Sequence, residues 1–228
     1  MSKLLGILGG MGPLATVDFL QKLIEETPAT RDQEHLPVIA YSVPQIPERP
    51  AAITGNGESP LPQMLQGVQT LKQAGAQAIA IACNTAYFWY DELVAQGGLP
   101  VLHIADAACA ELSATRVGLI ATDGTLVAGF YQSRLQARGI ACLTSSIAEQ
   151  HSLVQPAIEC VKRNALAQAY ALATQAAQQL IERGAQTIIL GCTEIPLAIE
   201  YQASAVTTRC VDATRALARA CVEWSRGN

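Results

Sequence analysis

Charge is scarce in this sequence. Only 15% of its 228 residues are charged, and 15 Lys and Arg against 19 Asp and Glu leave a formal net charge of −4. No run of basic residues offsets that acidic balance, so we expect no nucleic-acid partner. No apolar run is long enough to cross a bilayer, so we expect no membrane partner either.

Paired cysteine motifs are also missing. The seven cysteines form no CxxC pair and lie at positions 83, 109, 142, 160, 192, 210 and 221. This spacing predicts neither a disulfide framework nor a zinc site, so we expect no metal. Reduced thiols are typical of the cytoplasm, where we expect the protein to work.

An internal repeat is what the sequence does have. "GAQAIAIAC" at 75–83 matches "GAQTIILGC" at 184–192 with an offset of 109 residues, and "LGILGGMGPLATVDF" at 5–19 resembles "VGLIATDGTLVAGFY" at 117–131 with an offset of 112. Two matches in the same order indicate a duplicated domain. The apolar N-terminal run therefore has a twin deep in the chain, which favours a core strand over a secretion signal.

Each half alternates apolar strands with amphipathic helices, the pattern of a parallel sheet covered on both faces. We predict an α/β protein of two similar small domains, related by pseudo-twofold symmetry, each a parallel sheet flanked by helices. The first domain should comprise residues 1–102 plus 211–228, and the second 103–210, with the final helix packed on the first. The predicted strands are 3–9, 37–43, 77–82 and 100–103, then 116–121, 140–144, 187–191 and 206–210. The predicted helices are 14–26, 61–74, 125–138, 152–183 and 212–224, and residues 41–62 should form a long functional loop.

Cys83 and Cys192 are equivalent residues of the repeat, each at the end of a predicted strand. Ligands of open parallel sheets bind beyond the carboxyl ends of the strands, so both thiols should face the cleft between the domains. A base on one face of a carbon and an acid on the other can invert its configuration, and two thiols can exchange those roles. Free cysteines are often simply buried, but the repeat and the polar residues that follow each cysteine favour a functional pair. We assign the other five cysteines to packing.

The motifs "GILGGMGPLAT", "CNTA" and "GCTEIPL" resemble the aspartate/glutamate racemase superfamily, in particular its aspartate racemase branch, over nearly the whole chain. The resemblance implies an amino-acid racemase that uses two bases, one on each face of the substrate, and needs neither pyridoxal phosphate nor metal. It also implies a homodimer and an acidic amino acid as substrate, aspartate before glutamate.

Carried over by position, Cys83 and Cys192 are the acid/base pair. Arg49 matches the arginine that holds a substrate carboxylate, which suits the bidentate geometry of a guanidinium group. Lys162 resembles a lysine that approaches the substrate from the second domain. The remaining expected substrate-binding residues are Met11, Asn84, Thr85, Thr125, Thr193 and Glu194.

One position departs from the family, which often reads "CNTAH" where this sequence has Tyr87. If that side chain contacts the substrate, the polarity of the site is changed and aspartate specificity is in question.

Three alternatives stay open. "GMGPLA" at 10–15 fits a dinucleotide fingerprint, although the second predicted strand ends in Tyr41-Ser42 without the acidic residue that NAD binding requires. Hydantoin racemisation or decarboxylation would use the same fold. A non-catalytic amino-acid clamp would bind a ligand without turnover.

Overall fold

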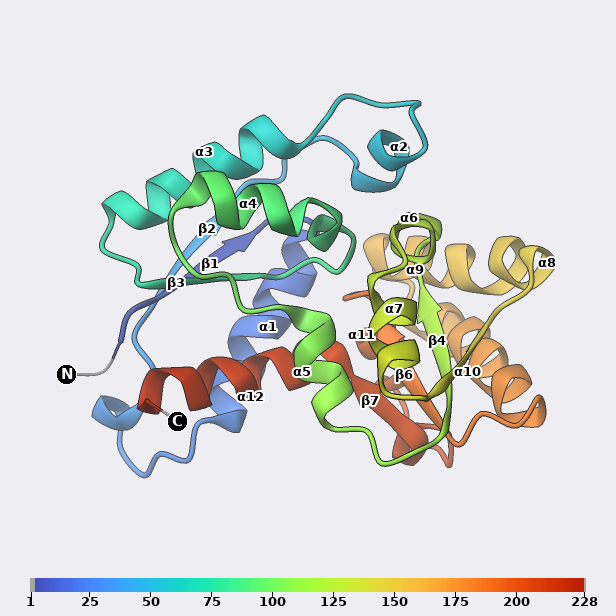
Figure 1. Cartoon of the computed structure of the whole chain (residues 1–228). Helices are drawn as coiled ribbons and strands as arrows, with labels where there is room; N and C mark the ends of the chain where they lie inside the picture. The colour runs from blue at the N-terminus through green and yellow to red at the C-terminus, as the bar shows by residue number, and fades with distance from the viewer. Residues whose placement is uncertain (1–2, 228) are drawn as a thin grey trace.

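The computed structural model describes residues 3–227, and its strands form two parallel sheets, one in each half of the chain (Figure 1). The first sheet has the order β2-β1-β3, and the second has the order β5-β4-β6-β7. Their strands are β1 (Leu5–Gly9), β2 (Val38–Ser42), β3 (Ala78–Ile81), β4 (Arg116–Ala121), β5 (Ala141–Thr144), β6 (Thr187–Gly191) and β7 (Cys210–Asp212). The predicted fold class is confirmed.

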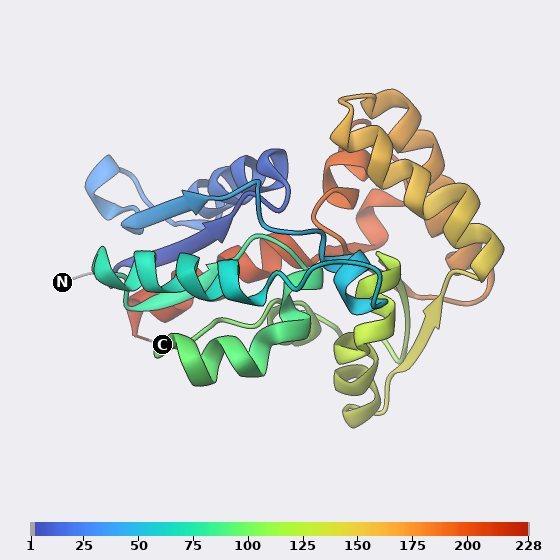
Figure 2. The same ribbon diagram turned by 90° about the horizontal axis from the view of Figure 1, so that it is seen from above.

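Helices flank both sheets, and the two halves lie side by side (Figure 2). Up to the end of the first half they are α1 (Pro13–Glu26), α2 (Arg49–Ile53), α3 (Leu61–Gln73), α4 (Tyr90–Gly97) and α5 (Ile104–Ala110). The second half contains α6 (Asp123–Ala128), α7 (Phe130–Ala137), α8 (Ile147–Glu149), α9 (Gln155–Lys162), α10 (Leu166–Glu182) and α11 (Ile195–Ile199). The last helix, α12 (Ala213–Arg226), returns to pack on α1 and α5. The domain limits proposed from the sequence stay a prediction, and residues 1, 2 and 228 of the first domain lie outside the described residues.

The repeated "GAQ" has the same structural task in both halves. Gly75 and Gly184 follow a helix with φ angles of 96° and 97°, a conformation that favours glycine. Two residues later, Gln77 Oε1 accepts a hydrogen bond of 2.9 Å from the Leu4 amide, and Gln186 Oε1 accepts one of 2.9 Å from the Thr115 amide. Each glutamine thus fastens the third strand of its sheet to the first, which positions both cysteines.

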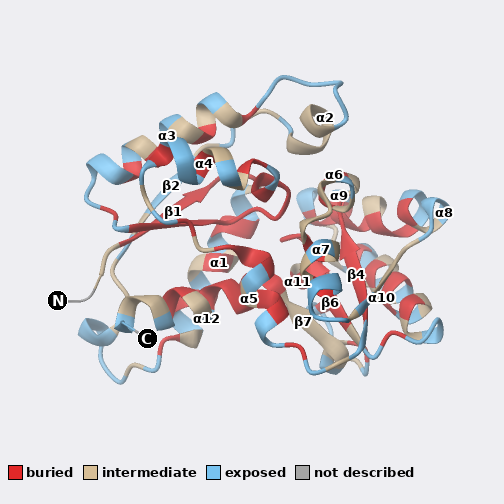
Figure 3. Ribbon diagram, in the orientation of Figure 1, coloured by how far each residue is buried: buried red, intermediate tan, exposed pale blue. Residues whose placement is uncertain are grey.

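The core follows from this pattern. The central strands are buried (Figure 3), with the burial of β1 and β3 complete along their length. Apolar residues of the flanking helices cover both faces of each sheet, as the continuous apolar strands predict. Within residues 3–227, no helix is long and apolar enough to cross a membrane.

Several predicted elements differ in detail. Residues 100–103 form only an isolated bridge, Val101 to Ile79. The strand predicted at 206–210 begins only at Cys210, as β7, because a 3₁₀ turn occupies 207–209. The helix predicted at 125–138 is divided by Gly129, whose φ is 70°. The helix predicted at 152–183 begins with a π-helical turn (Gln150–Val154) and is broken after Lys162 at Asn164, whose φ is 59°. The 41–62 loop contains α2.

Candidate active site

Cys83 and Cys192 lie where the sequence placed them, just beyond the ends of β3 and β6. Their exposures are only 4% and 3%, and both line one small cavity of about 30 Å³ between the two halves. The other residues that line it are Met11, Arg49, Pro50, Asn84, Thr85, Thr122, Ile158, Lys162, Thr193 and Glu194. The duplicated strand ends therefore deliver two thiols to one enclosed space.

Cys192 is paired with an acidic neighbour. Its Sγ donates a hydrogen bond of 3.1 Å to Glu194 Oε2, and the Thr193 hydroxyl donates one of 3.2 Å to the same oxygen. Burial raises the pKa of the Cys192 thiol well above its usual value, and the negative charge of Glu194 raises it further. Cys192 consequently keeps its proton in this arrangement.

Two side chains that line this cavity each have a buried donor with no hydrogen-bond partner among the described residues. These donors are Nε of Arg49 and Nδ2 of Asn84. The rest of the Arg49 guanidinium is held by backbone carbonyls, at 3.1 Å from Ile46 O and 3.0 Å from Pro47 O, with a longer contact of 3.4 Å to Met11 O. Buried donors without partners are costly, so an anionic group that accepts from both would be bound favourably.

Three threonine hydroxyls join the halves beside the cavity. Thr85 Oγ1 lies 2.8 Å from Thr122 Oγ1 and 3.0 Å from Thr125 Oγ1, and Thr122 and Thr125 are themselves 3.0 Å apart. Thr85 and Thr122 line the cavity, whereas Thr125 is fully buried behind them and does not. The structure therefore places Thr125 as a support for Thr85 rather than at the cavity surface.

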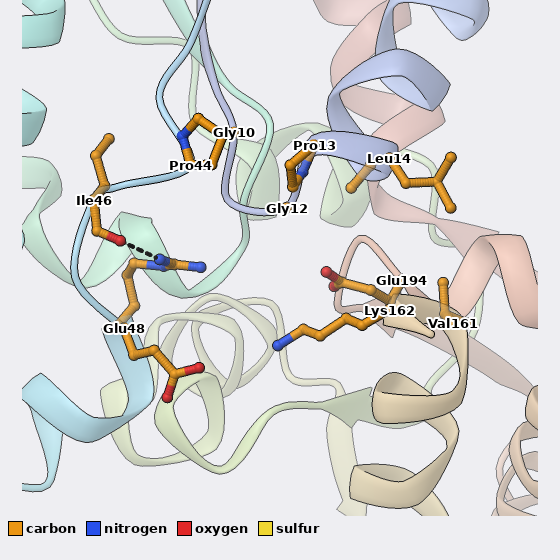
Figure 4. Close-up of a pocket in the computed structure, with 12 residues that line it drawn as sticks. Gly10, Gly12, Pro13, Leu14, Pro44, Ile46, Glu48, Val161, Lys162 and Glu194 are labelled. Carbon is orange, nitrogen blue, oxygen red and sulfur yellow. Dashed lines mark hydrogen bonds between the residues drawn. The ribbon is translucent and has the colours of Figure 1, made fainter. Parts of the chain in front are cut away.

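A larger cavity of about 430 Å³ adjoins the first (Figure 4). Arg49, Lys162 and Glu194 line both spaces, so they connect the cysteines with the outer cavity. Lys162 and Glu48 extend toward one another in this view, and Glu194 lines the same cavity. Leu14, Ile46 and Val161 provide apolar wall. The site thus combines cationic, anionic and apolar surface within the reach of a small amino acid.

No group of three or more His, Cys, Asp or Glu side chains is arranged to hold a metal ion within residues 3–227.

Comparisons with known proteins identify the family of the chain. A family model described as Asp/Glu/Hydantoin racemase matches residues 8–221. The chain belongs to this racemase family. The structure is similar to that of Picrophilus torridus aspartate racemase, with a TM-score of 0.87, 29% identity, and coverage of 98% of this chain and 94% of that chain. An aspartate racemase homologue from Pyrococcus horikoshii OT3 gives a TM-score of 0.76 at 25% identity, covering 99% of this chain and 100% of that chain.

The sequence is also similar to the broad specificity amino-acid racemase RacX of Bacillus subtilis (strain 168). The two are 26% identical over 227 residues, which is 96% of each chain.

The departure of this racemase-family chain at Tyr87 lies outside the cavity. The Tyr87 hydroxyl donates a hydrogen bond of 2.8 Å to Leu102 O and accepts one of 3.3 Å from the Ile81 amide. The centroid of its ring lies 4.7 Å from that of His103. Tyr87 therefore completes the core at the end of β3. The concern that it alters substrate contact is not supported, because the side chain turns back onto its own half.

Residues missed from the sequence reach the site from less obvious positions. Thr122 caps α6, where its hydroxyl accepts 3.1 Å from the Thr125 amide, and it is the repeat equivalent of Gly10. Its place after the first strand of the second half was a usable signal. Glu48 precedes Arg49 and lines the outer cavity, but nothing in its spacing distinguishes it from a solvated loop charge.

Proposed function

We infer that this protein is an amino-acid racemase that uses Cys83 and Cys192 as its acid/base pair and acts on an acidic amino acid, aspartate before glutamate. One observation carries the proposal: equivalent cysteines of the two halves line a single buried cavity. Likeness to an aspartate racemase over nearly the whole chain supports the substrate order.

The chemistry needs one ionised and one protonated thiol. A thiolate removes the α-proton, and the electron pair of the broken C–H bond passes into the α-carboxylate. The opposite thiol then gives its proton to the other face of Cα and keeps the S–H electrons, so the two cysteines end with their roles exchanged. Because Cys192 holds its proton firmly, we assign it the acid role in the form described here, with Cys83 as the base.

The α-proton of the substrate leaves more easily when the negative charge that passes into its α-carboxylate is stabilised. The unpartnered donors of Arg49 and Asn84 are suited to bind that carboxylate, and they would stabilise the negative charge that develops on it. Lys162 is the cation available for a second carboxylate on the side chain, and Glu194 offers negative charge to the substrate ammonium group.

The inner cavity of about 30 Å³ is close to the volume of one water molecule. An amino acid is several times larger, so we expect the Arg49 segment and α9 to move apart when substrate enters from the outer cavity.

Proton NMR in D2O tests the proposal. The protein would be incubated with L- and D-aspartate, both glutamate enantiomers, and a panel of neutral and basic amino acids. We expect the α-proton signal of aspartate to disappear fastest, with the opposite enantiomer appearing. Absence of exchange throughout the panel, despite measurable binding, would instead identify a clamp without turnover.

Cysteine variants test the mechanism. Cys83→Ser and Cys192→Ser should each lower the rate of racemisation by about a hundredfold to ten-thousandfold, the usual contribution of a positioned acid or base. Cys142→Ser, in β5 and away from the cavity, is the matched control and should keep its activity. Near-normal activity in either active-site variant would rule out the two-thiol mechanism.

A further inference from the structure

Tyr131 connects α7 of the second half with the residue that follows Cys83 in the first. The tyrosine is completely buried, and its hydroxyl lies 2.6 Å from Asn84 Oδ1. This separation is at the short end for hydrogen bonds between oxygen atoms. Burial raises the pKa of Tyr131 well above its usual value, so the phenol stays protonated and available as a donor.

This hydrogen bond fixes the orientation of the Asn84 amide. With Oδ1 occupied by the Tyr131 hydroxyl, Nδ2 is left buried and without a partner among the described residues. Asn84 lines the cavity together with Arg49, whose Nε is unpartnered in the same way. Were the amide reversed, the oxygen of Asn84 rather than its NH2 group would be left without a partner.

The repeat has no second copy of the Tyr131–Asn84 hydrogen bond, which joins the two halves. With the offsets of 112 and 109, the equivalent of Tyr131 is Phe19 and the equivalent of Asn84 is Thr193. Phe19 has no hydroxyl, and Thr193 donates to Glu194 instead. The two halves therefore differ beside their cysteines. Only Asn84, next to Cys83, is held by a tyrosine and could supply a donor to a substrate carboxylate.

We propose that Tyr131 is a positioning residue that holds the Asn84 amide with its NH2 group toward the substrate α-carboxylate. The inference rests on the proposed function for the identity of the ligand. Tyr131 does not line the cavity, so it would act on carboxylate binding through Asn84, across the junction of the two halves.

The decisive variant is Tyr131→Phe, which removes only the hydroxyl. Asn84 is then free to turn, so carboxylate binding should weaken in the ground state, and more so in the transition state, where the carboxylate carries additional negative charge. We expect both KM and the Kd for L-aspartate to rise about tenfold and kcat to fall in addition. A purely structural role would instead lower the melting temperature and the active fraction while leaving KM and Kd as they are.

A double-variant cycle with Asn84→Ala identifies the partner. Tyr131→Phe should raise Kd in the wild-type background and have no further effect when Asn84 is already alanine. Equal effects in both backgrounds, or an unchanged Kd in Tyr131→Phe, would overturn the proposal. Phe19→Leu, at the equivalent position, is the control for repacking and should leave Kd unchanged.

Calorimetric titration with L-aspartate separates this proposal from the proposed function. If the wild-type protein binds aspartate without exchanging its α-proton, racemisation fails and the Tyr131 test still proceeds on Kd. If racemisation is observed and Tyr131→Phe matches the wild type, only the positioning role fails. If no amino acid of the panel binds, both proposals fail.

Discussion

At the scale of single residues, the acidic neighbour of Cys192 provides the sharpest test of the site. Glu194 raises the pKa of the thiol both as a charge and as a hydrogen-bond acceptor, although burial is the larger cause. Glu194→Gln removes the negative charge, so the pKa of Cys192 should fall while remaining above that of an exposed thiol. The rate of Cys192 alkylation by iodoacetamide, followed by mass spectrometry across pH, should therefore reach its half-maximum at lower pH than in the wild type.

Glu48→Gln is the control, because Glu48 lines only the outer cavity. It should leave the alkylation profile of Cys192 in place. An upward displacement in Glu194→Gln would contradict the assigned electrostatic role.

The same scale shows what the sequence could reveal about the site. Cys83 and Cys192 were identifiable because the repeat marks them as equivalent strand ends. Thr122 was missed although its place after a strand was a usable signal, whereas Tyr131 could not be identified, because its role depends on a hydrogen bond to a residue of the other half. Such contacts leave no periodicity in the sequence.

At the scale of elements, strands were more predictable than helix ends. Apolar runs fixed the central strands, while the Ala-rich stretch at 152–183 kept its helical pattern through a break. Asn164 adopts a φ of 59°, which asparagine tolerates better than most residues, and α9 consequently ends at Lys162 beside the cavity. A single asparagine was the only local signal of this break.

The helix α5 carries a pH-dependent cap. His103 Nδ1 accepts a hydrogen bond of 3.1 Å from the Ala105 amide. Its repeat equivalent, Asp212, accepts one of 2.8 Å from the Thr214 amide at the start of α12. Burial, with a contribution from Arg134 and against the effect of Asp106, lowers the pKa of His103 from 6.5 to about 4. Protonation would also remove the capping acceptor.

Because the folded pKa is the lower one, the stabilisation is complete above about pH 6.5 and is lost as pH falls through about 4. At about 1.4 kcal/mol for each pKa unit, the loss amounts to roughly 3 kcal/mol. His103→Asn keeps an acceptor without a titrating group. Between neutral pH and pH 4, the free energy of unfolding of the wild type in urea should therefore fall by that amount relative to that of the variant. A difference that stays constant with pH would contradict the account.

At the scale of the whole molecule, a buried ion cluster fastens the two ends of the chain together. Lys22 of α1 is 1% exposed and lies 2.6 Å from Asp18 and 2.7 Å from Asp212, which caps α12. The repeat predicted two similar halves, but it gave no indication that Lys22 and Asp212, 190 positions apart in the sequence, form an ion pair. Helix packing, which brings α12 onto α1, was needed to reveal it.

Removing this lysine should be costly. Burial lowers the pKa of Lys22, but the Asp212 and Asp18 carboxylates outweigh burial and raise it above the ordinary value of 10.5. Its contribution is therefore fully present at neutral pH and is lost only as pH rises through that higher folded pKa. Lys22→Met leaves the carboxylates of Asp18 and Asp212, whose side chains are 10% and 9% exposed, without their cation, and the free energy of unfolding in urea should fall by about 3–5 kcal/mol.

Lys72→Met, at an exposed position of α3, is the matched control and should change the free energy of unfolding by no more than about 0.5 kcal/mol. Adding Asp18→Asn to Lys22→Met removes one of the stranded charges, so part of the lost stability should return. If Lys22→Met cost less than about 1 kcal/mol, or if Asp18→Asn made the double variant less stable still, the cluster would not be the fastening between the chain ends that its geometry indicates.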